Sequence, residues 1–158
     1  MATPVELAAL FRRDLTRLIQ EVEAFPEDAM LWRTLPGIAN SAGNLTLHLE
    51  GNLREFIGRQ LGGVDYQRQR ALEFSSSSLT ARDLAVRIEH VRELVPPVIA
   101  ALSAAQLAAP YPEKVLGAPI STAQFVMHLY GHLSYHLGQI DYLRRMLSTG
   151  AAVNFAAL

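Results

Sequence analysis

The chain has 158 residues, of which half are hydrophobic and 18% are charged, with a formal net charge of −1. This composition favours one folded domain with a proper core, and the lack of any Lys/Arg block gives no electrostatic case for a nucleic-acid partner. Because the chain has no cysteine, no apolar run near the ~20 residues of a membrane span and no signal-peptide pattern at its N-terminus, we expect a soluble, cytoplasmic protein without disulfides.

The first predicted helix begins with a capping box over residues 3–6 and ends at Pro26. Its apolar residues recur at helical spacing and predict a buried stripe, made by Phe11, Leu15, Leu18 and Val22. Residues 27–40 then contain a short helical piece and a turn. The second helix is predicted over residues 41–61 and ends at Gly62-Gly63, because glycine tolerates the left-handed conformation that closes helices. Residues 64–78 are predicted to form a long loop.

The third helix is predicted to start near Thr80, and Pro96-Pro97 should kink or end it, since proline lacks a backbone donor and clashes with the preceding turn. Residues 104–118 are predicted to be a connection. The fourth helix runs from Ser121 to about Leu147. Four long helices predict an all-α four-helix bundle, with one domain over residues 1–150 and a short tail over residues 151–158.

The fourth helix carries two neighbouring stripes when its residues are placed about 100° apart. One stripe holds the histidines and comprises Phe125, His128, His132, His136, Gln139, Leu143 and Met146. The other is aliphatic and comprises Val126, Leu129, Leu133, Leu137, Ile140 and Leu147. The clearly polar side comprises Ser134, Asp141, Arg144 and Arg145. Such a helix is expected to be buried on two sides. We expect the histidine stripe to face the bundle interior and the aliphatic stripe to form a subunit interface, so a homodimer is a hypothesis.

Histidines four residues apart on one helical face can reach a single metal ion. The same spacing also suits hydrogen-bonded core histidines or a pH switch, and it does not by itself decide among the three. A third ligand would have to come from another helix, and His48 on the buried side of the second helix is the best candidate. Asn52 and Glu55 share a polar line at helical spacing with Asn44 and His48, so they are candidates to support the metal or to act as acid or base; the alternative is an ordinary buried polar pair or helix-surface residues. His90 is interpreted as a surface residue.

Two segments carry a family resemblance: HLEGNLREFIGRQLGGVDYQRQRALEF (His48 to Phe74) and HLYGHLSYHLGQI (His128 to Ile140). They resemble the DinB-like (DinB/YfiT) superfamily, in a bacterial branch of uncharacterised members. The resemblance implies an up-down-down-up four-helix bundle, usually dimeric, with a divalent metal held by His48, His132 and His136. His128 matches a family histidine that is not usually a ligand. Leu137 replaces an arginine that the family often has, which weakens any anion-binding role there.

The resemblance also suggests a function. The metal is expected to be nickel or zinc, with manganese or iron as alternatives, and three neutral imidazoles leave a coordination position open, as in catalytic sites. Relatives imply a metal-dependent enzyme that acts on a small molecule, either a thiol S-transferase that uses a low-molecular-weight thiol or a hydrolase. The alternative is a non-catalytic metal-binding or structural dimer.

Further candidate site residues lie near the predicted metal. Gln139 follows His136 by about one turn and would either orient it or serve packing alone, and Tyr135 would either donate to the substrate or only line the bundle. Arg68 and Arg70 in the 64–78 loop would either meet an anionic substrate or form ordinary surface ion pairs.

Overall fold

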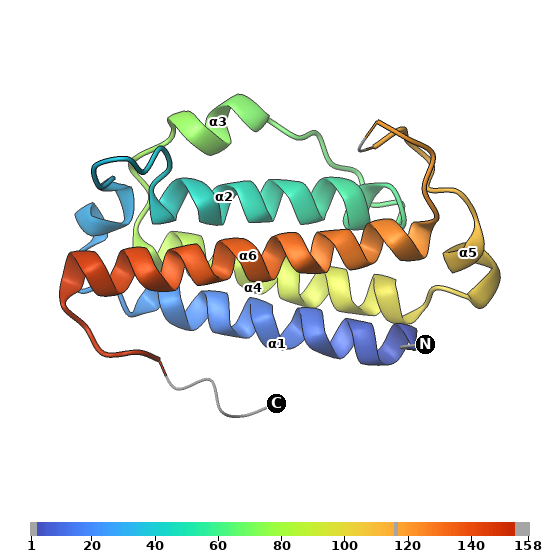
Figure 1. The fold of residues 1–158 in the computed structure, drawn as a ribbon, viewed down its shortest axis with the longest axis horizontal. Coiled ribbons are helices and arrows are strands. Elements are labelled where there is room, and N and C mark those ends of the chain that lie inside the picture. Colours follow the sequence, from blue (N-terminus) through green and yellow to red (C-terminus); the bar gives the residue numbers. More distant parts are fainter. Residues whose placement is uncertain (1–2, 116, 154–158) are drawn as a thin grey trace.

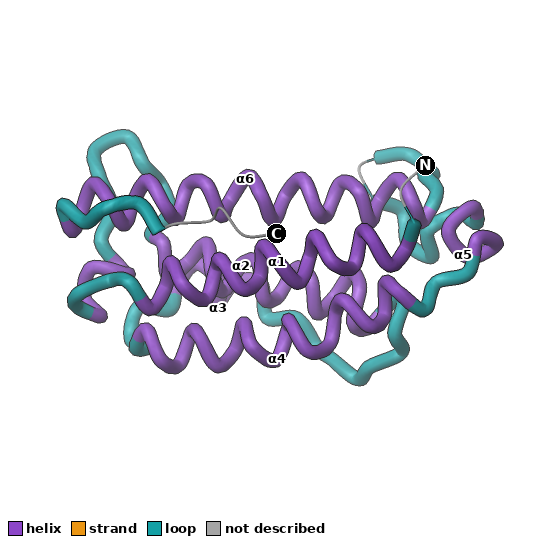
Figure 2. Tube along the Cα trace, turned by 90° about the horizontal axis from the view of Figure 1, so that it is seen from below, coloured by secondary structure: helices purple, strands orange, loops and turns teal. Residues whose placement is uncertain are grey.

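The computed structural model describes residues 3–115 and 117–153 and is built of helices joined by loops (Figure 1). Four long helices lie side by side along the long axis in both views (Figures 1 and 2): α1 (Pro4–Glu23), α2 (Ala42–Leu53), α4 (Ala81–Ala100) and α6 (Thr122–Ser148). Four short helices complete the order: η1 (Asp28–Trp32), η2 (Arg54–Arg59), α3 (Arg70–Ser75) and α5 (Ala104–Ala108). Within the described ranges no strand forms, only isolated bridges.

The four long helices have the predicted up-down-down-up order. In Figure 1, α1 and α6 run in one direction, and α2 and α4 run in the other. Because α2 and α4 are parallel, residues 64–80 must cross back over the full length of the bundle, and α3 lies on this crossover, packed on α2. This arrangement brings α3 close to the middle of α2, where His48 lies.

The start of α1 and its buried face both agree with the sequence. Thr3 caps α1 through a reciprocal capping box with Glu6, as predicted. The four residues of the predicted stripe are fully buried, namely Phe11, Leu15, Leu18 and Val22. They face α4 and α6, against which α1 packs. No helix in the described part of the chain is both long and apolar enough to cross a membrane.

Two predicted connections contain short helices, and the third helix does not end at its prolines. The 64–78 segment is not all loop, because it contains α3, and the 104–118 connection contains α5. Pro96 and Pro97 do not end the third helix, which continues to Ala100. Ile99 beyond the prolines is fully buried, so core packing keeps this turn helical even though the prolines cannot donate backbone hydrogen bonds.

The second predicted helix changes type part-way, since α2 passes at Arg54 into the π-helical turn η2. Single π turns of this kind often lie near functional sites. The Tyr111 hydroxyl donates to the Phe56 carbonyl over 2.7 Å, which ties the loop before α6 to this turn. The helix stops where predicted, as Gly63 adopts a positive φ of 66°. At the other end, the predicted tail from residue 151 is described only to residue 153, and residues 154–158 lie outside the described part.

Candidate metal centre

Three histidines from two helices meet beside the middle of the bundle. The Nε2 atom of His132 lies 3.2 Å from Nε2 of His48 and 3.0 Å from Nε2 of His136. One ring nitrogen from each of the three residues can be chosen so that all lie within 4.8 Å of one another. His132 and His136 meet because they are one turn apart on α6, and His48 joins them because α2 packs against α6.

The outer nitrogens of two of these rings have partners that fix where the protons sit. Nδ1 of His48 lies 2.9 Å from a carboxylate oxygen of Glu73, and Nδ1 of His136 lies 2.6 Å from the side-chain oxygen of Gln139. Both partners are acceptors when Glu73 is ionised, and the contact of His48 Nδ1 to Glu73 is shorter than its 3.3 Å contact to the Arg68 guanidinium, so each Nδ1 carries the proton and donates it. The Nε2 lone pairs of both rings therefore point toward His132.

This arrangement fits a divalent cation. If His132 carries its proton on Nε2, it can donate to only one of its two neighbours; if the proton is on Nδ1, three lone pairs face one another. A cation between the rings accepts all three lone pairs. Tetrahedral zinc with bonds of about 2.0–2.1 Å places its ligand nitrogens about 3.3 Å apart. The two observed contacts of 3.0 and 3.2 Å are close to that spacing.

The electrostatic surroundings of the cluster keep two of its histidines neutral, as metal ligands must be. Burial, reinforced by the neighbouring histidines, lowers the pKa of His132 to about 4. Burial also lowers the pKa of His48, although the hydrogen bond to Glu73 opposes this. For Glu73, burial alone would raise the pKa, but hydrogen bonds from Arg68 and His48 outweigh it and lower the pKa. Near neutral pH, His48 and His132 are thus neutral ligands, and Glu73 is an anion that supports one of them.

The orientation predicted for α6 was wrong in part. The aliphatic stripe faces the bundle interior, and only the ends of the histidine stripe join it there. Val126, Leu129, Leu133, Leu137 and Ile140 are all buried within the chain's own core, together with Phe125 and Leu143. His132 and His136 are half-buried at the edge of the bundle, and His128 and Met146 are exposed. The stripe assigned to a subunit interface is therefore occupied by intramolecular packing, because a helix in a bundle turns its most apolar side inward. Arg144, assigned to the polar side, is buried against Glu21.

The structure adds Glu73 to the site, which the sequence reasoning missed. This residue lies on α3 and is buried, and Arg68 holds its carboxylate with two hydrogen bonds of 2.6 and 2.8 Å. Gly51 makes room for it, because a Cβ atom there would lie only 2.2 Å from a carboxylate oxygen of Glu73. A glutamate next to aromatic and aliphatic residues in RALEF was the available signal, but it lay in a segment interpreted as loop.

A groove of about 460 Å³ opens beside the cluster. It is lined by His48, Asn52, Phe56, Arg70, Glu113, Lys114, Val115, Phe125, His128, Leu129 and His132. Asn52 is only 7% exposed, and its side-chain oxygen has no hydrogen-bond partner among the described residues. A buried amide oxygen without a partner costs free energy unless a ligand or water satisfies it. Asn52 thus offers one acceptor next to the side of the cluster that a ligand can approach.

The remaining candidates lie in different places. Gln139 contacts His136 as described above. Glu55 accepts from Arg59 over 2.8 Å and lines a separate pocket, which does not include the three histidines. Tyr135 is 65% exposed, with its ring 5.3 Å from that of His136. His90 is exposed, as interpreted from the sequence.

Comparisons with known proteins agree with this fold. Residues 7–156 match the family described as "Protein of unknown function (DUF1572)". The chain belongs to this family. No curated protein matched the DUF1572 chain. Among solved structures, it is similar to a DinB-like protein from Bacillus cereus ATCC 10987, with a TM-score of 0.72 and 14% identity over 94% of this chain and 95% of that one. This match confirms that the fold of the DUF1572 chain resembles that of DinB-like proteins, as predicted.

Proposed function

We propose that the protein is a metal-dependent enzyme that acts on a small molecule, with a divalent ion held by His48, His132 and His136. One observation carries the proposal: Glu73 and Gln139 fix the protons of two rings so that their free lone pairs converge on the third. Carboxylate and amide partners on the outer nitrogen are what metal-binding histidines usually have. Nickel and zinc both suit an imidazole site.

Bound metal would supply a Lewis acid that lowers the pKa of a water or thiol at its open position. The chain's own residues do the rest. Three neutral ligands leave the charge of the ion uncompensated, and the groove gives a substrate access to it. Asn52 accepts a hydrogen bond from a group bound beside His48, and the apolar residues of the groove keep water away from the substrate.

Two reaction classes suit such a site: transfer of a thiol and hydrolysis. The chain has no cysteine, so in thiol transfer the sulfur must come from a separate low-molecular-weight thiol. Activity panels with the metal-loaded protein distinguish the two classes, because only one of them depends on added thiol.

The first test is metal content. The protein is purified without a histidine tag, reconstituted with zinc or nickel, and measured by mass spectrometry. We expect about one ion per chain in the wild type and loss of at least tenfold in affinity in His132→Ala, because two imidazoles hold a metal far more weakly than three. His128→Ala and His90→Ala are matched controls and should keep the ion.

Two results would contradict the proposal: a wild-type protein that takes up no metal, or equal metal loss in all three histidine variants. A protein that binds metal but is silent in both activity panels would favour the non-catalytic alternative. The homodimer stays a prediction, and light scattering at micromolar concentration tests it.

A further inference from the structure

The positive charges of this protein are almost all paired. The chain has 14 Lys and Arg residues. Within the described ranges, only Arg33, Arg70 and Lys114 have no carboxylate oxygen within 4.0 Å, because every other arginine forms at least one ion pair. Two of these three, Arg70 and Lys114, line the groove beside the histidine cluster.

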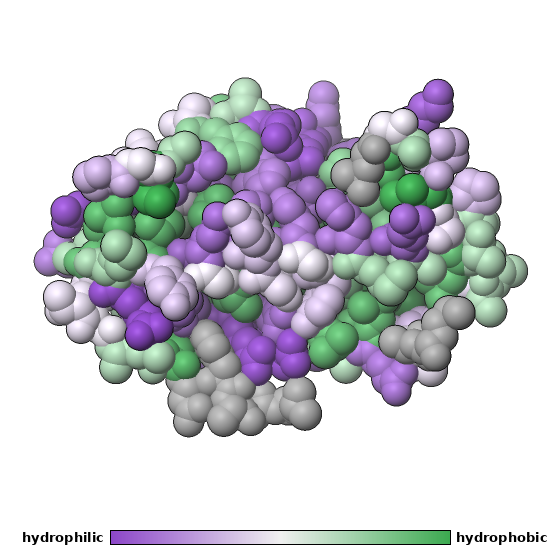
Figure 3. Space-filling view, in the orientation of Figure 1, coloured by the Kyte–Doolittle hydropathy of each residue, from purple (hydrophilic) through white to green (hydrophobic). Residues whose placement is uncertain are grey.

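These two side chains come from separate segments. Arg70 begins α3, and Lys114 lies in the loop before α6, which the Tyr111 hydrogen bond ties to η2. Both segments lie beyond α2 on the same side of the bundle (Figure 1). Figure 3 shows hydrophilic residues gathered on this face between the α3 segment and the loop. Lys114 is also the only lysine of the chain.

Among the described residues that line the groove, the one carboxylate does not neutralise this pair. Glu113 accepts hydrogen bonds from Arg59, over 2.9 Å, and from Gln60. The apolar part of the groove is made by Phe56, Phe125 and Leu129, with the rings of Phe56 and Phe125 edge to face at 5.4 Å. The groove therefore joins two cations that have no carboxylate partner to an aromatic surface and to Asn52.

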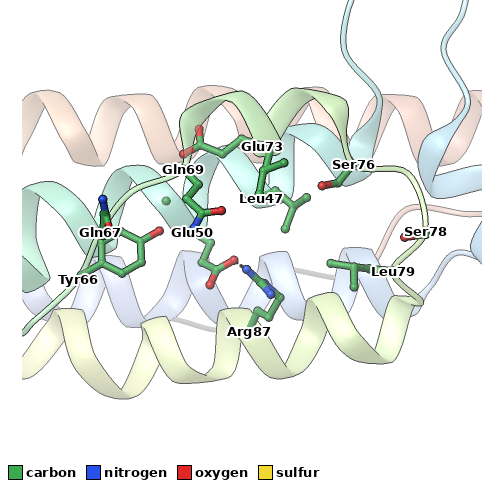
Figure 4. Close-up of a pocket in the computed structure, with 12 residues that line it drawn as sticks. Leu47, Glu50, Tyr66, Gln67, Gln69, Glu73, Ser76, Ser78, Leu79 and Arg87 are labelled. Atoms are coloured by element: carbon green, nitrogen blue, oxygen red, sulfur yellow. Dashed lines mark hydrogen bonds and ion pairs between the residues drawn. The ribbon is translucent and has the colours of Figure 1, made fainter.

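A second pocket provides the contrast. It has a volume of about 440 Å³ and lies between α3, α2 and α4 (Figure 4). Its charged groups are already paired, because the carboxylate of Glu50 accepts from Arg87 over 2.6 Å and from Arg54 over 3.1 Å. Glu73, which also borders this pocket, is held by Arg68 and His48. No unpaired charge among the described residues of that pocket selects a ligand.

We propose that the groove binds a small organic anion with an apolar body, whose charged group lies between Arg70 and Lys114 while its body packs on the aromatic rings. The proposal rests on the proposed function in that it names the substrate class of the same site. Two cations without a carboxylate partner can be matched by one carboxylate or phosphate monoester, and arginine suits both through its forked donors.

The test compares binding of phenylacetate, phenyl phosphate and neutral phenylacetamide to the metal-loaded protein by calorimetry. The variants are Arg70→Gln, Lys114→Gln and the double variant, with Arg33→Gln as the matched control for an unpaired arginine outside the groove. We expect at least one anion to bind more tightly than the amide, and each groove substitution to weaken the anion about tenfold. The better anion identifies carboxylate or phosphate. Arg33→Gln should change nothing.

A second readout uses the single lysine. Amine acetylation of Lys114, followed by mass spectrometry, should be slowed by the bound anion and not by the amide. Metal content is measured in every variant. If the double variant keeps its metal and binds the anion as the wild type does, or if the wild type prefers neither anion over the amide, this inference is wrong while the metal site stands. If the wild type holds no metal, the proposed function fails, and the same comparison in the metal-free protein still decides the role of the two cations.

Discussion

At the scale of single residues, the site depends on where two protons lie. A metal-binding imidazole needs a free lone pair on the nitrogen that faces the ion. The hydrogen-bond partner of the other ring nitrogen decides whether that lone pair is free. Glu73 and Gln139 provide that control for His48 and His136. The negative charge of Glu73 also makes His48 a more basic ligand. An uncharged acceptor at the same position would raise the basicity of His48 less.

Glu73→Gln should therefore weaken metal binding by about 10–100-fold while leaving the three histidines in place. The amide can still accept from His48, but it has no charge, and Arg68 would lose its ion-pair partner. Competition with a chelator measures the affinity. Glu55→Gln removes a paired carboxylate outside the cluster and should leave the affinity unchanged; an equal loss in both variants would mean that general charge, and not the contact to His48, matters.

At the scale of elements, the site depends on how closely α3 approaches α2. The close contact at Gly51 allows the Glu73 carboxylate to reach His48 over the surface of α2. Any side chain at this position would have to push Glu73, or α3 with it, away from the ring.

Gly51→Ala is thus expected to weaken metal binding by at least tenfold, since the added Cβ displaces the carboxylate that orients His48. Helix propensity works in the opposite direction, because alanine favours a helix over glycine by up to about 1 kcal/mol. Gly131→Ala on α6 is the matched control: a Cβ there meets nothing within 4 Å, so it should raise the free energy of unfolding and keep the metal. Chelator competition and thermal unfolding distinguish the two effects. Unchanged metal affinity in Gly51→Ala would show that α3 adapts without moving Glu73.

At the scale of the whole molecule, stability and the site depend on different groups. The guanidinium of Arg144 on α6 binds the carboxylate of Glu21 on α1, and both side chains are buried. This pair links the first and last long helices of the chain and does not include any residue of the histidine cluster. Breaking a buried ion pair leaves one uncompensated charge in a medium of low polarity.

Arg144→Ala should lower the free energy of unfolding by about 3–5 kcal/mol, because Glu21 would remain buried without its partner. Arg145→Ala, one residue later, removes a partly exposed pair with Asp141 and an exposed contact with the Tyr142 ring, and should cost less than about 1 kcal/mol. Denaturant unfolding measures both. Below the unfolding transition, both variants should still bind one metal ion; loss of metal from folded Arg144→Ala would mean that the bundle and the site are coupled.

Periodicity and capping in the sequence were sufficient to predict the four long helices and the histidines that recur every four residues along one face of the last helix, because these depend on neighbours within a few residues. The position of His48 on the second helix made it the best candidate for a third ligand, and the resemblance to a family added the up-down-down-up order and the choice of His132 and His136 over His128. The packing between elements could not be predicted in the same way. The apolar surfaces of α1 and α2 decide which stripe of α6 faces inward. The helical turn at Pro96-Pro97 is stabilised by the burial of residues that follow the prolines.

Glu73 is the clearest case of what tertiary structure alone decided. It is 25 residues from His48 in the chain, on a short helix without a strong local pattern, and it reaches the ring only because the crossover packs on α2 at a glycine. Local propensity determines helices because each hydrogen bond closes over four residues. A site made by a helix, a crossover and a loop depends on burial and shape across the whole bundle, which no short stretch of sequence contains.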